Sequence, residues 1–431
     1  MKERLLKTLQ VALKKLAIAT IRRYKPAVIG VTGSVGKTST KQTVYTVINN
    51  DRRVRTSAEN FNNELGMPLT ILGNWNHTGG VFFWLKVLIK SVFQLVVKTS
   101  YPELLILEYA ADRPGDIDYL LDIVKPQISI VTAVGEKPVH VEFYSGPEAV
   151  AKEKAKLVEC LKSDEVAILN VDDTSVFAMK EKTKARVFTY GFSEGADMRI
   201  INFETHTSEK SAPDGISFKL ENGGSTVPIR IKNALGKSQA YAAAAAASVG
   251  LLFGFNLVKI SEKLSHYKSE KGRATSIQGI KGSYIIDDTY NASPLAVKSA
   301  LEILSELKAE RRIAVLANMA EMGRFSDKAH EEVGAAAAKV ADILVTVGDK
   351  ARLIAEGARK AGAGIAKSNI VSCGNSEEAT NFLKRTVRKG DMILIKGSQS
   401  TRMEKVVKEL MLKPSDAKDL LVRQYGKWLK S

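Results

Sequence analysis

The stretch VIGVTGSVGKTSTK, which runs from Val28 to Lys41, decides how the first half of this sequence folds. An apolar run leads into a loop of small residues, and the loop ends in a lysine followed by hydroxyl side chains. Such a run is typical of a buried β-strand, and glycines let a loop turn so that backbone N–H groups point inward. The helix expected next directs the positive end of its dipole at the same place. The stretch therefore predicts a phosphate-binding loop between a strand and a helix.

The residues of this loop have separate expected roles. Gly33 and Gly36 shape the backbone, Lys37 adds a mobile positive charge, and Thr38 offers a hydroxyl group to Mg²⁺. The loop residues expected to bind the nucleotide are Gly33, Ser34, Gly36, Lys37, Thr38 and Ser39. The strict form of the motif has Gly or Ala where this sequence has Val31, and a phosphate loop alone predicts only that some nucleotide binds.

Length and composition restrict the classes of protein to consider. A chain of 431 residues, 45% of them hydrophobic, predicts two or three domains with ordinary cores. Cys160 and Cys373 fit neither a metal-binding spacing nor a disulfide framework, which suits a reducing cytosol. Five scattered histidines argue against a histidine-built metal site. We find no secretory signal and no run of about eighteen apolar residues, so a membrane span is not expected.

The net charge of +17 is concentrated at the start of the chain. Residues 1–25 hold eight Lys or Arg residues against one Glu, and the tail from Lys405 to Lys430 is also basic. Nucleic acid, an anionic membrane surface or an anionic substrate would each account for this charge, and so would solubility alone. Charge by itself does not decide among them.

Local patterns predict a helix followed by two α/β units. Residues 2–24 carry an apolar stripe made by Leu5, Leu9, Leu13, Leu16 and Thr20. In the first unit the expected strands are Val28–Thr32, Leu104–Glu108, Ile128–Thr132 and Val166–Asn170, before a strand-rich stretch over 186–232 and an alanine-rich helix over Gln239–Val249. In the second unit they are Tyr284–Asp288, Ile313–Ala317, Ile343–Val347, Ile370–Cys373 and Met392–Lys396. The expected domains are a basic amphipathic helix in 1–25, a central nucleotide-binding domain in 26–272 and a C-terminal domain in 273–431.

An apolar insert at about 74–100 is unusual within the central domain. Lys86, Lys90, Gln94 and Lys98 are spaced by four, which predicts a narrow polar stripe on an otherwise apolar helix over 81–98. We expect a core helix whose lysines extend to solvent. The alternative is a helix that contacts a membrane surface or a partner.

Several further motifs follow the phosphate loop in a fixed order. They are NFNNELGMPLTIL (Asn60–Leu72), LILEYAADRPGDI (Leu105–Ile117), HVEFYSGPEAVAKEKAKL (His140–Leu157), DDTYNASP (Asp287–Pro294), NMAEMG (Asn318–Gly323) and IKGSQSTRMEKVV (Ile395–Val407). Together with the loop form G-x-x-G-x-x-G-K-T, they resemble the Mur ligases, and among these the branch that adds D-alanyl-D-alanine. The resemblance covers residues 28–410. It implies a phosphate-loop central domain with a parallel sheet and a Rossmann-like C-terminal α/β domain.

The resemblance implies an ATP-dependent reaction at the central domain. Lys37 would hold the β- and γ-phosphates, and Thr38 and Glu108 would hold Mg²⁺. Glu108 ends the apolar run LLILE, as a carboxylate delivered by a buried strand should, although an exposed strand-end charge is the alternative. His140 aligns with a family histidine near a second metal and is expected at the catalytic site. The alternative for a lone histidine is a structural role.

Lys154 is the most specific expectation. In Mur ligases a lysine in an A-K-x-x-[IL] setting is carbamylated by CO₂, and the anion so formed helps to position Mg²⁺. Here the segment EKAKL aligns Lys154 with that lysine, although Glu153 stands where the family has alanine. Only a neutral amine reacts with CO₂, so burial or nearby positive charge must lower the pKa. The alternatives are an exposed lysine on a basic helix, or Lys152 or Lys156 as the true equivalent.

The C-terminal domain would complete the site. Asp288 and Asn291 match positions that contact ribose and adenine, and Arg273 matches the G-R at the entry to this domain. The residues expected on the substrate side are Asn62, Asn63, Glu321, Lys396, Gly397 and Ser398. A K-G-S turn is common by itself, so these positions depend on the resemblance.

The sequence also departs from the family. Typical members carry an N-terminal domain of about a hundred residues that binds the uridine nucleotide of the substrate, whereas only a basic helix precedes the phosphate loop here. The family's H-N-x-x-N is S-Q-A-Y-A at Ser238–Ala242, its G-D-M is Ala317–Met319, and a metal-side Asn is Ala133. Because the phosphate loop, Glu108 and the Lys154 region are kept, we expect retained ATP chemistry, whereas these changes leave the acceptor open.

The expected enzyme is therefore an ATP-dependent, ADP-forming ligase with Mg²⁺. It would add D-Ala-D-Ala or an amino acid to a cell-wall peptide precursor through an acyl-phosphate. Two alternatives stay open: a Mur-like ligase for another acid acceptor, such as a poly-amino-acid or a lipid-linked glycopeptide, and a nucleic-acid-stimulated ATPase. The last would need aromatics interleaved with arginines, so nucleic acid is not expected as a partner. We expect a cytoplasmic enzyme in an oligomeric state that the sequence leaves open. If 81–98 is instead the surface helix of the alternative above, it and 2–24 would contact an anionic membrane peripherally.

Overall fold

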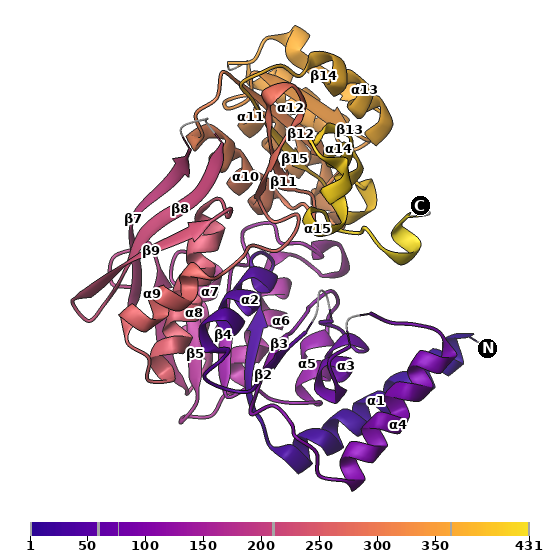
Figure 1. Ribbon diagram of the computed structural model, residues 1–431, viewed down its shortest axis with the longest axis vertical. Helices are drawn as coiled ribbons and strands as arrows, with labels where there is room; N and C mark the ends of the chain where they lie inside the picture. Colours follow the sequence, from indigo (N-terminus) through magenta and orange to yellow (C-terminus); the bar gives the residue numbers. More distant parts are fainter. Residues whose placement is uncertain (1, 58–60, 76, 209–211, 363, 430–431) are drawn as a thin grey trace.

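The computed structural model describes residues 2–57, 61–75, 77–208, 212–362 and 364–429. Asn60 of the NFNNELG motif lies outside these ranges, and the side chain of Leu5 is not described. The chain forms two sheets, each covered by helices, and the two layered units lie one above the other in Figure 1.

The first sheet has nine strands in the order β2-β3-β1-β4-β5-β6-β7-β8-β9. Their bounds are β1 Ala27–Thr32, β2 Val54–Thr56, β3 Leu104–Glu108, β4 Ile128–Val131, β5 Val166–Asn170, β6 Arg186–Gly191, β7 Met198–Thr207, β8 Pro213–Asn222 and β9 Ser225–Lys232. Strands β1 to β6 are parallel, and β7, β8 and β9 form an antiparallel extension. The predicted strands of the first unit are confirmed to within one residue at each end.

Both faces of the parallel part are buried, which is why its strands are continuously apolar. Ile29 and Val31 of β1 point into one core with helices α2 (Lys37–Ile48) and α8 (Lys237–Leu252), while Val28 joins the opposite core. The alanines of α8 let it pack closely against α2 and the sheet. The other face is covered by α1 (Lys2–Tyr24), α3 (Gly66–Leu72), α5 (Asp116–Leu121) and α6 (Pro147–Glu159).

The second sheet has six strands in the order β10-β11-β15-β12-β13-β14. Their bounds are β10 Thr275–Gln278, β11 Tyr284–Asp288, β12 Arg311–Ala317, β13 Ile343–Val347, β14 Ile370–Cys373 and β15 Asp391–Lys396. All neighbours are parallel except β10 with β11. The remaining helices are α4 Val81–Val96, α7 Thr174–Phe177, α9 Leu257–Ser265, α10 Pro294–Glu306, α11 Ser326–Ala337, α12 Arg352–Ala361, α13 Ser376–Thr386, α14 Glu404–Leu410 and α15 Ala417–Leu420.

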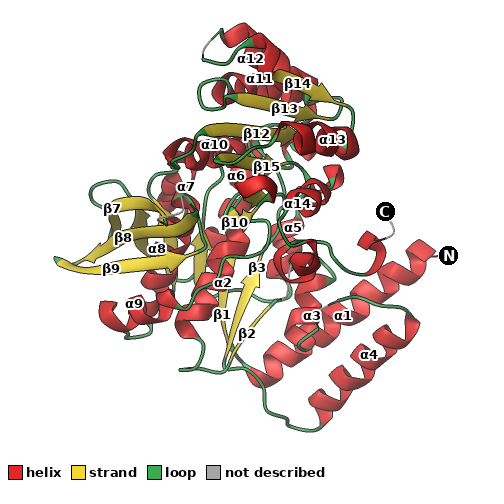
Figure 2. Ribbon diagram, turned by 45° about the horizontal axis from the view of Figure 1, so that its top comes forward, coloured by secondary structure: helices red, strands yellow, loops and turns green. Residues whose placement is uncertain are grey.

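Helices α1 and α4 form a layer at the edge of the molecule (Figure 2). Helix α1 packs against both α3 and α4, and Leu13 and Ala17 on its predicted stripe are fully buried. The expectation of a core helix at 81–98 is wrong, because Phe82, Ile89 and Val96 are 88%, 61% and 73% exposed. In the described part of the chain, no helix combines the length and apolar character needed to cross a bilayer.

Candidate active site

Two adjoining cavities lie where the carboxyl ends of strands from both sheets face each other. The first, here called the phosphate cleft, has a volume of about 510 Å³, and the second, here called the side cavity, of about 610 Å³. Both are bordered by Val35 and Gly36 of the phosphate loop. Residues lining the phosphate cleft include Ser34, Lys37, Thr38, Asn62, Glu108, Asp112, His140, Arg273, Asn291, Glu321, Ser398 and Trp428. Ligands of open α/β sheets bind at this edge of the strands.

The phosphate loop has the backbone shape that the glycines predict. Gly33 and Gly36 have φ values of 146° and 89°, and a Cβ atom on Gly33 would lie 1.9 Å from the hydroxyl of Thr132. Lys37 donates a hydrogen bond to the carbonyl of Gly33 at 2.9 Å. The hydroxyl of Ser34 is buried with no hydrogen-bond partner among the described residues. An unpaired buried donor beside a lysine at a helix N-terminus is suited to a phosphate oxygen.

Glu108 is a buried carboxylate at the centre of the site, so the alternative of an exposed strand-end charge is wrong. It is 2% exposed, and its side chain lies 3.4 Å from the Thr38 hydroxyl, 3.8 Å from Lys41 Nζ and 3.0 Å from Asn62 Nδ2. Burial would raise the pKa of Glu108, but the charges of Lys41 and Lys37 and the bond from Asn62 lower it below its usual value. The group is therefore held ionised.

Thr38 and Glu108 together fit Mg²⁺. The described residues contain no group of three or more His, Cys, Asp or Glu side chains that would enclose a metal ion. Mg²⁺ typically needs only one or two protein carboxylates, because waters and substrate phosphates complete its shell. One carboxylate and one hydroxyl beside a phosphate loop match that requirement.

Lys154 is buried and solitary. It is 1% exposed, and neither a hydrogen bond nor an ion pair joins it to another described residue. Burial and the nearby charge of Lys37 lower the pKa of Lys154 to about 7. The amine is therefore substantially neutral near physiological pH, which is the form that reacts with CO₂.

The neighbouring lysines have other surroundings. Lys152 is exposed, and Lys156 pairs with Asp118 and Glu153 at 2.6 Å each. Although burial opposes the effect, these two bonds raise the pKa of Lys156. Glu153, which replaces the family alanine, also accepts the backbone N–H groups of Gly115 and Ile117 at 3.0 Å each. It therefore anchors the start of α5.

His140 and Arg273 connect the two domains across the phosphate cleft. The His140 ring lies 3.2 Å from Asp112 through Nε2 and 2.7 Å from Glu321 through Nδ1. The hydrogen bond with His140 lowers the pKa of Glu321. Arg273 reaches back to the Thr38 hydroxyl at 3.5 Å, and its guanidinium lies 3.9 Å from the centre of the Tyr290 ring.

The two asparagines expected on the substrate side have different positions. Asn62 lines the phosphate cleft and bonds to Glu108. The Asn63 side chain is exposed and accepts the backbone N–H groups of Leu65 and Gly66 at 3.2 and 3.0 Å. Asn63 therefore caps α3 instead of facing the cleft.

The C-terminal residues expected at the site form a wall whose charges are paired. Lys396 is 2% exposed and donates to the Asp288 carboxylate at 2.6 Å and to the Asn291 carbonyl at 2.9 Å. Asn291 and Ser398 line the cleft, whereas Asp288 and Lys396 are not among the described lining residues. At Gly397 a Cβ atom would lie 2.5 Å from the Thr401 hydroxyl, so glycine is required for packing.

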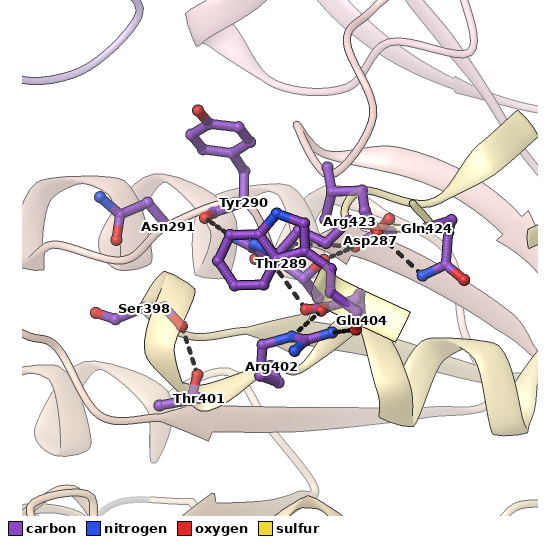
Figure 3. Close-up of polar contacts among 12 residues, drawn as sticks. Asp287, Thr289, Tyr290, Asn291, Ser398, Thr401, Arg402, Glu404, Arg423 and Gln424 are labelled. Carbon is purple, nitrogen blue, oxygen red and sulfur yellow. Dashed lines mark hydrogen bonds and ion pairs between the residues drawn. The ribbon is translucent and has the colours of Figure 1, made fainter. Parts of the chain in front are cut away.

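The sequence analysis missed a second buried charge cluster behind this wall (Figure 3). The Glu404 carboxylate, 0% exposed, lies between Arg402 at 2.5 Å and Arg423 at 2.9 Å. Arg423 also donates to the carbonyls of Thr289 and Tyr290. This arrangement ties the C-terminal segment, which brings Trp428 to the cleft, onto the loop after β11.

Two other features were also missed. Lys41 bonds to the Ser57 hydroxyl at 2.6 Å and faces Glu108, and its position four residues after Lys37 places both lysines on one helix face. The side cavity is lined by apolar Pro294 and Leu295, by Asn170, and by Tyr241, which donates to Asp172 at 2.8 Å. Ser39 is buried in α2 and does not border either cavity among the described lining residues.

Comparisons with known proteins agree with this arrangement. Residues 88–250 match the Mur ligase middle domain, and residues 272–399 match the Mur ligase, glutamate ligase domain. The UDP-N-acetylmuramoyl-tripeptide–D-alanyl-D-alanine ligase of Mycobacterium leprae is 31% identical over 90% of this chain and 75% of its own length. The enzyme of the same name from Bacillus subtilis is 29% identical over 94% of this chain and 80% of its own length.

Solved structures show the same architecture. MurF ligase from Thermotoga maritima, in complex with ADP, has a TM-score of 0.75 and 26% identity over 93% of this chain and 83% of its own. MurF from Acinetobacter baumannii has a TM-score of 0.77 and 24% identity, and the match covers 94% of this chain and 81% of its own. This match supports the fold. The predicted resemblance and fold class are confirmed, and the chain belongs to the Mur ligase family of ATP-dependent, peptide-bond-forming enzymes.

Proposed function

We propose that this enzyme joins a carboxyl group of a cell-wall peptide precursor to the amine of D-alanyl-D-alanine, with ATP converted to ADP and phosphate. The names of its relatives point to this substrate pair. The observation that carries the proposal is a single cleft in which Lys37 and Glu108 of the central domain face Arg273, Glu321 and Ser398 of the C-terminal domain. Residues that would bind an activated acid and an incoming amine thus border the same space.

ATP is proposed to bind across both cavities. Its phosphates would lie against Lys37, the free Ser34 hydroxyl and the amino end of α2, which Gly36 precedes. Its adenosine part would enter the side cavity, where apolar Leu295 and Pro294 border one part and polar Asn170 another. Asn291 would contact the nucleotide, and the Asp288–Lys396 pair would position it, because Lys396 holds the Asn291 carbonyl.

Mg²⁺ is proposed to bind through Thr38 and Glu108, where it would offset the charge of the phosphates and of the attacking carboxylate. A carboxylate oxygen of the acceptor attacks the γ-phosphorus, the bond to ADP breaks, and an acyl-phosphate results. Lys37 and Arg273 would stabilise the negative charge that spreads over the transferred group. The uncharged amine of D-Ala-D-Ala then attacks the acyl carbon, phosphate leaves, and the new amide nitrogen loses a proton.

Lys154 is proposed to act as a carbamate. Its neutral amine attacks CO₂, an N–C bond forms, and one proton is released, so a neutral buried amine becomes an anion. That anion would face Lys37, whose charge already acts on this position, and would help to position the metal. His140, between Asp112 and Glu321, would hold the domains in the closed arrangement that brings the two substrates together.

The reaction is proposed to occur in the cytoplasm, where ATP is available. The free thiols of Cys160 and Cys373 suit that reducing compartment. Contact with the membrane surface is a separate proposal, argued below from helices α1 and α4.

An assay of ADP release tests the proposed function. The full chain is incubated with ATP and Mg²⁺, and acceptors are crossed with D-Ala-D-Ala and with single amino acids. UDP-N-acetylmuramoyl-tripeptide, a lipid-linked form of the same peptide and a poly-amino-acid serve as acceptors, and Lys37→Ala serves as the inactive control. We expect release only when a muramoyl-peptide acceptor and D-Ala-D-Ala are both present, with a product of the summed mass. Release that depends on DNA or RNA and ignores D-Ala-D-Ala would contradict the proposal.

A further inference from the structure

Helix α4 has apolar residues on both faces: Phe83, Trp84, Val87 and Leu88 pack inward, and a second apolar set faces outward. Gln94 and Ser91 are buried at 6% and 1% exposure. The large apolar residues that are at least 45% exposed on this helix and directly after it are Val81, Phe82, Leu85, Ile89, Val92, Phe93, Val96 and Val97. A soluble helix normally has a polar outer face, and a contiguous exposed apolar face marks an interaction surface.

Specific contacts with α1 fix this orientation. The Tyr24 hydroxyl donates to the Gln94 carbonyl at 2.7 Å, and Arg23 donates to the Val96 carbonyl at 3.3 Å. The Gln94 side chain donates to the Thr20 hydroxyl at 3.5 Å. Val87 adds an apolar contact to the core that contains Leu13. Because this inner face is already packed and hydrogen-bonded, the exposed apolar residues of α4 cannot turn inward without breaking the layer.

The charge around this face has one sign. Residues 1–25 and 81–98 together carry eleven Lys or Arg residues and one acidic residue, Glu3. A groove on α4 is lined by Phe82, Leu85, Ile89 and Phe93 together with Lys86 and Lys90. A second groove, on α1, is lined by Lys15, Ile18, Ala19, Arg22 and Arg23. Apolar side chains bordered by cations are complementary to acyl chains bordered by anionic headgroups.

We propose that the α4 face and the basic residues of α1 dock this enzyme on an anionic bilayer surface. The helix would lie in the plane of the interface, since its 16 residues span about 24 Å and the hydrocarbon core is about 30 Å thick. A second copy of the chain fits the face poorly, because a two-fold contact would bring the basic groups of both copies together. Anionic lipid instead neutralises them.

The position of this layer suits a surface-bound enzyme. The amino end of α1 and the C-terminal segment that ends at Leu429 lie on the same side of the molecule (Figures 1 and 2). Trp428 of that segment borders the phosphate cleft. Docking through α1 and α4 would therefore place the Trp428 border of the cleft on the bilayer side of the molecule. Membrane binding is a property separate from the proposed ligation, because it is measured without catalysis.

Co-sedimentation with vesicles tests the proposal. The full chain is mixed with vesicles of phosphatidylcholine alone or with one-third phosphatidylglycerol, at low and at high salt. We expect binding to the anionic vesicles that weakens at least tenfold at high salt, because screening removes the electrostatic part. Absence of binding to anionic vesicles at low salt would overturn the proposal.

Matched variants separate the apolar and the basic contributions. Phe82→Asp with Ile89→Asp should weaken binding at least tenfold, whereas Val258→Asp, at a 72% exposed apolar residue of α9, should not. Lys86→Glu with Lys90→Glu should weaken it similarly, unlike Lys219→Glu with Lys232→Glu on the β extension. Circular dichroism melting verifies that each variant is folded. Equal binding by the α4 and control variants, or a dimer in solution that Phe82→Asp with Ile89→Asp dissociates, would overturn the proposal.

Discussion

The two walls of the phosphate cleft differ in whether their cationic side chains are paired with carboxylates. On the central-domain side, Lys37 and Lys154 have no carboxylate within 4 Å among the described residues, and neither has Arg273, which reaches across from the start of the C-terminal domain. On the C-terminal side, Lys396 pairs with Asp288, and both Arg402 and Arg423 pair with Glu404. The named cations of the first wall therefore have no carboxylate partner, whereas each named cation of the second wall has one.

This difference separates ligand-binding from scaffold roles. Cations that are crowded together raise the free energy of the empty site, and an anionic ligand removes that cost. Paired and buried charges cost desolvation energy but fix a single geometry, so that losing one partner mainly destabilises the fold. We therefore expect substitutions on the central side to reduce catalysis, and substitutions on the C-terminal side to reduce stability.

The largest effect is expected at Lys37 and Glu108. Lys37→Ala and Glu108→Gln should each lower kcat/KM for ADP release by about 1,000-fold, because each removes a charge that faces the phosphates or their metal. Glu108→Gln keeps the volume and can still accept the bond from Asn62. Lys350→Ala, at an exposed lysine, is the control. Near-normal turnover in either folded variant would remove that residue from the proposed chemistry.

Lys154 should have the next largest effect. Lys154→Ala is expected to lower activity by about 10- to 100-fold, as removal of a group that orients a metal site does. Acetate or propionate should restore part of it, because a small carboxylate can occupy the place of the carbamate. Lys152→Ala, at an exposed position on the same helix, should be unaffected.

The pH dependence of Lys154 provides a second readout. With a pKa of about 7, its amine is protonated and unreactive below that value and neutral above it. Carbamate formation, and with it activity, should therefore rise with pH through about 7 and fall when bicarbonate is removed. Activity that does not depend on bicarbonate, together with no rescue, would argue against a carbamate.

On the C-terminal wall of the cleft, we expect substitutions to lower stability more than activity. Glu404→Ala leaves Arg423 buried without its carboxylate, which should destabilise the protein by about 3–5 kcal/mol in urea or thermal unfolding. Activity at low temperature should fall less than tenfold. Glu409→Ala, on the same helix but 53% exposed, should cost no more than about 1 kcal/mol. If Glu404→Ala lowered activity more than tenfold and left the free energy of unfolding unchanged, the contrast between the two walls would be wrong.

The smallest effects distinguish two adjacent asparagines. Asn62→Ala should lower activity about tenfold, because Glu108 loses a hydrogen bond within the cleft. Asn63→Ala should leave activity unchanged and cost about 1 kcal/mol of stability, since its side chain caps α3. Equal loss of activity in both variants would place Asn63 back on the substrate side.

Much of the fold was predictable from local patterns. Helix α1 and strands β3, β5, β11, β13 and β14 have the predicted bounds, because periodicity and apolar runs report burial along one segment. The phosphate loop was equally clear, since only glycine tolerates the backbone at Gly33. For α4 the sequence favoured a core helix and kept a surface helix as the alternative, because periodicity shows that a helix has two faces and does not show which one a neighbour covers.

The site was predictable as a set of motifs and not as a set of contacts. The sequence could not choose among Lys152, Lys154 and Lys156, since alternate positions of a helix point to opposite sides. The tertiary structure buries Lys154 and pairs Lys156. It likewise pairs Lys396 with Asp288 and closes Arg402 and Arg423 around Glu404, none of which the motifs indicated.

The sequence by itself therefore determined the elements, the phosphate loop and the family. Each of these depends on residues close together in the chain, where spacing has a direct geometric meaning. Only the tertiary structure decided which charges meet, which lysine loses its proton and which side of α4 faces outward. Those properties depend on burial and on partners brought together from distant segments, and the energy of a charge is set by its surroundings more than by its residue type.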